Sequence, residues 1–144
     1  MGFFGKKRKG SFIDKDTFYH LNISFDQGGF LHNSKLIVSV NQKPVEFFGK
    51  KFRKIPPFSS TTMAIINDQL VQGSNNIKIE VEKLADVDVS AENEPCKFSM
   101  NIQKKLEGEI VDTKETESSL MNQDIQIQEN QFNESSIFEG SFDI

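Results

Sequence analysis

Few residues in this chain of 144 carry side chains that enzymes use for covalent or metal chemistry. A nucleophile needs a base within hydrogen-bonding reach, and the single cysteine, Cys96, has only His20 and His32 as partners, both distant in the sequence. Two histidines without a third ligand do not make a closed metal site. We therefore expect a non-enzymatic protein with no catalytic residue, no bound metal and no cofactor.

The acidic run from Asp86 to Glu92 resembles a calcium-binding loop only superficially. Ala91 stands where such a loop needs glycine, and Lys97 stands where it needs a bidentate glutamate. The run is typical of solvated charges at a strand edge, and an irregular calcium site is the alternative. Phosphate-binding loops and dinucleotide fingerprints are absent from the sequence.

Two segments combine phenylalanine with clustered cations. Residues 47–58 read FFGKKFRKIPPF, and residues 3–7 repeat the first five letters. Aromatic rings beside lysine and arginine suit membrane surfaces and nucleic acids, whereas the alternative places the rings in the core and only the cations in water. The candidate binding residues are Phe47, Phe48, Lys50, Lys51, Phe52, Arg53 and Lys54, with an N-terminal basic patch at Lys6, Lys7, Arg8 and Lys9.

Charge is distributed unevenly along the chain. Residues 1–60 hold 11 Lys/Arg against 4 Asp/Glu, whereas residues 106–144 hold 1 against 10. This asymmetry indicates a charged partner or an acidic tail that screens the basic face, although both ends could be ordinary solvated surface. Spaced apolar residues make the tail either a docking peptide or a source of short edge strands at 124–128 and 136–142. The docking candidates are Phe132, Ile137, Phe138 and Phe142.

Alternating hydrophobicity predicts the elements that must position these residues. Every second residue from Leu36 to Val40 and from Ile77 to Val81 is aliphatic, which is typical of half-buried antiparallel strands. The predicted strands are 17–25, 35–40, 45–48, 61–66, 77–81, 84–90 and 96–102. Turn residues separate them, so the sequence predicts an all-β fold, an antiparallel β-sandwich of the jelly-roll or immunoglobulin-like kind.

The domain organisation follows from the same patterns. We expect a flexible basic arm at 1–11, a sandwich at 12–105 and an acidic linker or tail at 106–144. No apolar run approaches the ~20 residues of a membrane span, and the basic N-terminus is not followed by the apolar core of a signal peptide. A cytoplasmic or peripheral location is therefore expected, and the lone cysteine fits a reducing compartment or a secreted domain without bridges.

A longer pattern spans Leu36 to Val81. In order, it contains Val40-Asn41, Val45, a Pro56-Pro57-Phe58 corner, a hydrophobic segment at 65–70, Gly73, Asn75 and the alternating strand 77–81. This order resembles the core of galactose-binding-like jelly-roll domains, the accessory β-sandwiches of glycoside hydrolases. Gln42 departs from the family's turn glycine. The resemblance implies a sandwich with a binding or spacer role and transfers no catalytic residue.

Two functional hypotheses follow. The first is a non-catalytic interaction or scaffolding module that binds another protein, or less readily a glycan, because the chain has no tryptophan and one tyrosine to form a sugar platform. The second is a peripheral anion-binding protein that contacts membrane or nucleic acid through its basic-aromatic segments, with an autoinhibitory acidic tail. Truncation at Lys105 should then increase binding to anionic surfaces.

Overall fold

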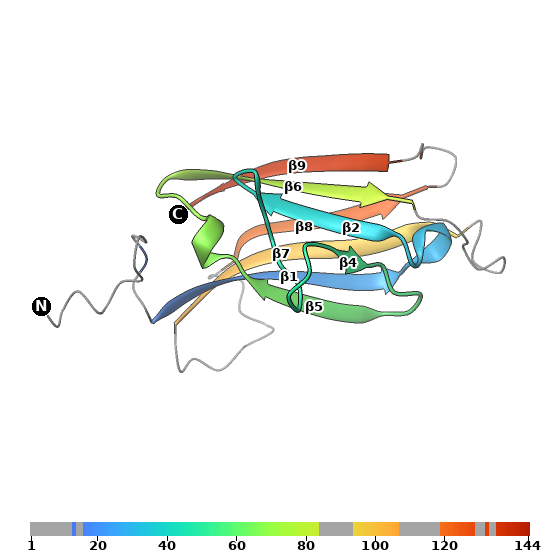
Figure 1. The fold of residues 1–144 in the computed structure, drawn as a ribbon, viewed down its shortest axis with the longest axis horizontal. Coiled ribbons are helices and arrows are strands. Elements are labelled where there is room, and N and C mark those ends of the chain that lie inside the picture. The colour runs from blue at the N-terminus through green and yellow to red at the C-terminus, as the bar shows by residue number, and fades with distance from the viewer. Residues whose placement is uncertain (1–12, 14–15, 84–93, 107–118, 129–131, 133–134) are drawn as a thin grey trace, which may run out of the picture.

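The computed structural model describes Ile13 and Phe132 and the ranges 16–83, 94–106, 119–128 and 135–144. These residues form two antiparallel sheets that face each other across a hydrophobic core (Figure 1). The expected all-β sandwich is confirmed. Among the described residues, helical structure is limited to two 3-10 turns, η2 (Gly29–Leu31) and η3 (Asn67–Gln69).

Each sheet combines strands from distant parts of the chain. The first sheet has the order β5-β1-β7-β8 and consists of β1 (Thr17–Gln27), β5 (Ser60–Ile65), β7 (Cys96–Leu106) and β8 (Ser119–Ile127). The second has the order β3-β2-β6-β9 and consists of β2 (Lys35–Val40), β3 (Lys43–Pro44), β6 (Ser74–Glu82) and β9 (Ser135–Asp143). The short strand β4 (Arg53–Lys54) pairs with β2 beside this order.

The core lies between the sheets because the alternating aliphatic residues all point inward. Antiparallel pairing of β2 with β6 places Leu36 opposite Val81 and Val38 opposite Ile79, and all four side chains are buried. Removing each such side chain from water contributes at most about 1.5–3 kcal/mol. A one-residue slip would expose the whole row, so the hydrophobic pattern also sets the register.

The sheets continue beyond residue 105, where the composition places the end of the sandwich. β8 pairs with β7 and β9 pairs with β6, so each forms one edge of a sheet. Ile125, Ile127 and Phe142 point from these strands into the core and are buried. The sequence left two alternatives for residues 124–128 and 136–142, edge strands or a docking peptide, and the structure has strands there. β8 also begins earlier than residue 124.

The predicted strand at 45–48 is wrong. Residues 43–44 form β3, so the strand ends at Pro44, before the predicted stretch begins. The Val45 N–H still donates to the Val38 carbonyl oxygen at 2.8 Å, but Phe48 and Gly49 have positive φ values of 52° and 82° and reverse the chain. Alternation alone could not distinguish this tight turn from a strand. The strand predicted at 84–90 and the basic arm at 1–11 lie outside the described residues.

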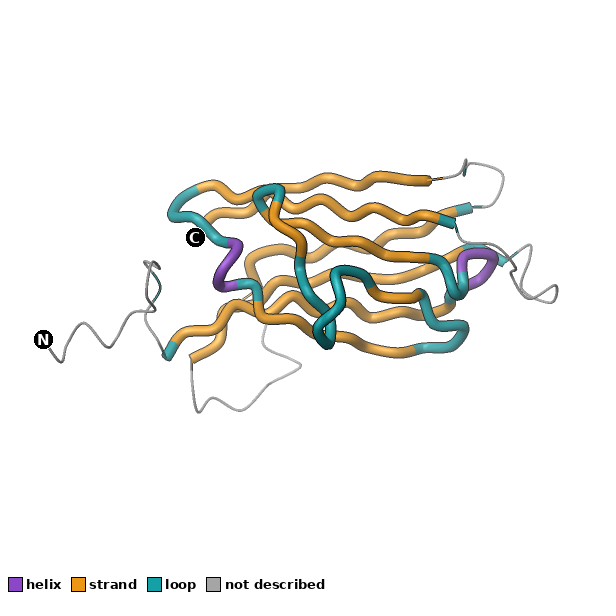
Figure 2. Tube along the Cα trace, viewed as in Figure 1, coloured by secondary structure: helices purple, strands orange, loops and turns teal. Residues whose placement is uncertain are grey.

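The connection from β3 to β4 is anchored to the core by buried side chains. Figure 2 shows it running from the β2–β3 hairpin across the front of the first sheet before it returns to β4. Val45, Phe47 and Ile55 are buried and anchor this connection to the core. The polar residues between these anchors are thereby held at the surface.

Candidate functional site

Residues 47–58, here called the basic-aromatic loop, begin with a tight turn. The Phe47 N–H donates to the Lys50 carbonyl oxygen at 2.7 Å, and the Lys50 N–H donates to the Phe47 carbonyl oxygen at 3.0 Å. Phe48 and Gly49 are the two central residues, and their left-handed φ values fit a type I′ turn. Such turns favour asparagine or glycine at the first central position, where this chain has phenylalanine.

The two phenylalanines of this turn have opposite environments. Phe47 is 2% exposed and belongs to the core, whereas Phe48 is 85% exposed. A left-handed conformation costs a bulky residue about 1–2 kcal/mol relative to glycine. Because its ring is in water, Phe48 regains little of this free energy by burial. The turn thus holds a strained, exposed aromatic ring at the surface.

Cations follow this ring closely in the sequence. Lys50, Lys51 and Lys54 are exposed, and Arg53 is half-buried, with its Nη1 donating to the Lys54 carbonyl oxygen at 3.0 Å. Within the described ranges, the only ion pair joins Lys78 to Glu80, so none of the acids in that part of the chain pairs with these lysines. Their charges are available to an anionic ligand.

Phe52 does not present an open ring. Its side chain is half-buried, and the Lys35 Nζ lies 4.9 Å from the ring centroid in a cation–π contact. One face of the ring is therefore already covered.

The structure exposes only part of the predicted binding set. Phe48, Lys50, Lys51 and Lys54 are exposed, whereas Phe47 belongs to the core and Phe52 is partly covered. The N-terminal patch at 6–9 lies outside the described residues. Phe58, 79% exposed at the end of the loop, was not among the predicted residues. Its signal in the sequence is the preceding Pro-Pro pair, which lacks N–H donors and resists incorporation into a sheet.

The tail residues predicted to dock on a partner mostly contact this chain's own core. Phe142 is 5% exposed, Phe138 is half-buried, and the half-buried Phe132 ring packs edge-on against Phe30 with centroids 5.5 Å apart. Ile137, at 54% exposed, remains at the surface of β9.

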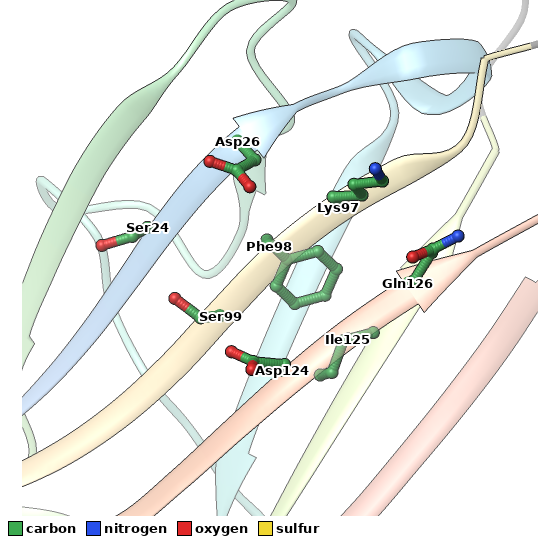
Figure 3. A pocket seen from close by; sticks show the side chains of 8 residues that line it. All are labelled: Ser24, Asp26, Lys97, Phe98, Ser99, Asp124, Ile125 and Gln126. Carbon is green, nitrogen blue, oxygen red and sulfur yellow. The ribbon is translucent and has the colours of Figure 1, made fainter.

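A second candidate site is a polar hollow of about 280 Å³ on the outer face of the first sheet. Figure 3 shows its polar side chains rising from three adjacent strands, with Lys97 between Asp26 and Gln126. Its polar lining is Ser24 and Asp26 from β1, Lys97 and Ser99 from β7, and Asp124 and Gln126 from β8. Sequence reasoning missed this site, because it needs β8 beside β7 and a bulge at Asp26.

The hollow can offer hydrogen bonds but no ring to stack on. Its two aromatic or aliphatic members, Phe98 and Ile125, are buried beneath the sheet. Nearby amides satisfy each other: the Asn101 Nδ2 donates to the Asn122 Oδ1 at 2.6 Å and to the Ser119 Oγ at 3.0 Å. Nothing in this lining selects one class of ligand.

Two titratable groups of the first sheet, Cys96 and His20, have shifted pKa values. Burial raises the pKa of the Cys96 thiol to about 12, so its reactive thiolate is scarce at neutral pH. Burial, and then the charge of Lys105, lower the pKa of His20. Within the described part of the chain, no group of three His, Cys, Asp or Glu side chains is placed to hold a metal ion.

The asparagines of the pattern at 36–81 serve the fold. Asn75 is 1% exposed, and its Oδ1 accepts hydrogen bonds from the Val71 N–H and the Asn41 Nδ2, both at 2.8 Å. Asn41 and Gln42 both have positive φ and form the β2–β3 turn. These polar groups are occupied by each other and by the backbone, which fixes one end of the sandwich.

No protein-family model, curated protein or solved structure matches the chain. The similarity to galactose-binding-like domains stays a prediction from the sequence. None of the described helical turns has the length and apolar character that a membrane span requires.

Proposed function

We propose that this protein is a non-catalytic β-sandwich that binds anionic membrane surfaces peripherally through its basic-aromatic loop. The observation that carries the proposal is the exposed Phe48 ring, held at positive φ beside Lys50 and Lys51. Strained conformations persist where surrounding structure imposes them, and they cluster at sites of function. An inserting ring and adjacent cations are the two components that an anionic lipid interface recognises.

The loop geometry favours a membrane over a nucleic acid. Single strands stack successive bases on several rings, whereas Phe48 is the one exposed ring at the start of the loop, because Phe47 is buried and Lys35 already covers one face of Phe52. Phe48 instead lies at the tip of a tight turn, which suits insertion between lipid headgroups. Its neighbours Lys50 and Lys51 would then reach the phosphates around the inserted ring.

The expected affinity is modest. Each lysine near an anionic surface contributes about 1 kcal/mol, and burial of a phenylalanine ring about 1.5–3 kcal/mol. Lys50, Lys51, Lys54 and Phe48 together reach about 5 kcal/mol, equivalent to a Kd on the order of 0.1 mM. Binding should therefore be reversible and should weaken steeply with salt.

Co-sedimentation with vesicles tests the proposal. The full chain should sediment with phosphatidylcholine vesicles that contain phosphatidylserine, and not with phosphatidylcholine alone. The double variant Lys50→Gln/Lys51→Gln loses about 2 kcal/mol and should bind roughly 30-fold more weakly. The matched control Lys104→Gln neutralises an exposed lysine on β7 and should bind like the wild type. Absence of wild-type binding, or an unchanged double variant, would refute the proposal.

Truncation at Lys105 is not a valid test of an inhibitory tail, because it also removes β8 and β9. Neutral replacements keep the strands intact. If the acidic stretch screens the loop, Glu115→Gln/Glu117→Gln should bind phosphatidylserine vesicles more tightly than the wild type, and the gain should vanish at high salt. Equal binding at low salt would exclude screening by these two residues.

Binding of another protein is the second candidate function, and the exposed Phe58 favours it. This ring follows Pro56-Pro57 and has no cation within two residues, so it offers apolar area without charge. Such a ring suits the apolar centre of a protein interface better than an anionic surface. If vesicles do not bind, a photo-crosslinking residue at position 58 should capture a protein partner and one at the exposed Gln123, on β8 at the far edge of the first sheet, should not.

A further inference from the structure

Strand β5 is an edge strand with one side unpaired. It pairs with β1 from Ser60 opposite Phe25 to Ile65 opposite His20, and no other strand pairs with it among the described residues. Figure 1 shows it at the margin of the first sheet. An unpaired edge is a template for another strand.

The pairing with β1 fixes which backbone groups face outward. The Ile66 N–H donates to the Tyr19 carbonyl oxygen at 3.0 Å. Backbone groups alternate along an antiparallel strand, so those of Ala64 and Thr62 also point to β1. The N–H and C=O groups of Thr61, Met63 and Ile65 consequently point away from the sheet.

The same three residues present their side chains on the outer face. Met63 is 48% exposed and Ile65 is 51% exposed, and Thr61 is also exposed. The strand thus offers apolar side chains together with unpaired backbone groups. Backbone hydrogen bonds provide affinity in strand addition, and the side chains add apolar contact.

β5 differs from the other described edge strands because it has no charged residue. The strand Ser60–Ile65 reads STTMAI and has no charged residue, proline or glycine, which are the usual devices that protect an edge. Each other described edge strand is charged. The protecting charges are Asp124 on β8, Glu139 and Asp143 on β9, Lys43 on β3, and Arg53 and Lys54 on β4.

We propose that β5 pairs edge to edge with β5 of a second copy of this chain, which joins the two first sheets into one continuous antiparallel sheet. An uncharged strand can approach its own copy without repulsion, whereas β8 and β9 would bring like charges together. A two-fold axis at Met63 sets this residue opposite itself and Thr61 opposite Ile65. All three outward-facing backbone positions then lie in hydrogen-bonded pairs, and the exposed apolar side chains cover each other.

Sedimentation velocity on the full chain over a range of concentrations tests the dimer. The wild type should pass from monomer to twice the monomer mass as concentration rises. Met63→Lys places two ammonium groups opposite each other at the axis and should weaken dimerisation at least tenfold. Glu139→Lys, the matched control on β9, should dimerise like the wild type. A wild type that stays monomeric, or a Met63→Lys dimer of unchanged affinity, would overturn the proposal.

A distance measurement keeps the proposal testable if Met63→Lys fails to fold. A spin label at Met63→Cys should give one short inter-label distance by pulsed electron resonance, because the residue faces itself across the axis. The same label at Glu139→Cys should give a long distance or none. Comparable short distances at both sites would refute pairing through β5. Membrane binding and dimerisation are measured separately, so either can fail without the other.

Discussion

Phe48 lies in a backbone conformation that favours glycine or asparagine, and its ring is exposed to water. Most positions of a natural sequence agree with both their backbone conformation and their burial, and departures concentrate at functional sites. Its neighbour Phe47, with the same side chain, is buried in the core. The contrast between these two adjacent residues is the reason for placing function in the turn.

Replacing Phe48 with asparagine should stabilise the protein. Asparagine tolerates positive φ, so Phe48→Asn should raise the free energy of unfolding by about 0.5–1 kcal/mol, as measured by urea denaturation. The same variant should bind phosphatidylserine vesicles more weakly.

Phe47→Asn is the paired control for this measurement. It removes a buried ring, so it should lower the free energy of unfolding by about 3 kcal/mol or more. A loss of stability in Phe48→Asn would mean that the Phe48 ring supports the fold, and the functional interpretation of the turn would then lose its basis.

His20 should make stability depend on pH. Its pKa in the folded protein is lowered from 6.5, first by burial and then by Lys105. Between the folded and unfolded pKa values the unfolded chain binds more protons, so stability should fall as pH drops below about 6.5 and this contribution should level off below the folded pKa.

The variant His20→Gln isolates this contribution. Urea denaturation of both proteins from about pH 7.5 to about pH 5.5 should show a steeper loss of stability in the wild type than in His20→Gln. Parallel curves would show that His20 has the same pKa in the folded and unfolded states.

At the scale of elements, the period of two along β1, β2, β6 and β7 made the central strands predictable, because their inward rows are almost purely aliphatic or aromatic. β8 and β9 were harder to predict. Their inward residues are fewer, and one of them is Gly140, where an added Cβ would meet the Met121 Cε. Acidic residues lie between these inward residues along both strands. The sequence therefore left edge strands and a docking peptide as alternatives there.

The alternation of hydrophobic residues does not predict two features of the surface, the exposed ring of the loop and the polar hollow. Phe47 and Phe48 are the same residue type at adjacent positions, and only the turn decides which ring faces water. The hollow depends on the register shift between Phe25 and Gln27, which leaves Asp26 as the extra residue of β1 beside Lys97. Both features arise from local backbone geometry that alternation does not encode.

The contribution of β9 to the stability of the sandwich can be measured by substituting two hydrophobic residues of this strand, one buried and one exposed. Phe142→Ala should lower the free energy of unfolding by about 3 kcal/mol or more, because its ring is buried in the core. Ile137→Ala, on the exposed face of the same strand, should change it by about 0.5 kcal/mol or less. Equal, small effects in both variants would indicate that β9 adds little to the stability of the fold.

At the scale of the whole molecule, basic and acidic residues are concentrated in different segments. The basic-aromatic loop and the uncharged β5 are consecutive in the chain, whereas β8 and β9 carry acidic residues at the other edges of the sheets. A dimer through β5 would carry two copies of the loop. If both reached one surface, the second contact would be intramolecular, and weak single contacts would give much tighter binding.

Entry of Phe48 into an anionic lipid interface can be measured directly. Because the chain has no tryptophan, Phe48→Trp provides a single fluorescent reporter in the turn. Its emission should shift to shorter wavelength when phosphatidylserine vesicles are added, return on addition of salt, and be quenched by brominated lipid, whereas a tryptophan at the exposed Gln123 on β8 should not respond. An emission maximum at position 48 that does not change with vesicles would contradict the account.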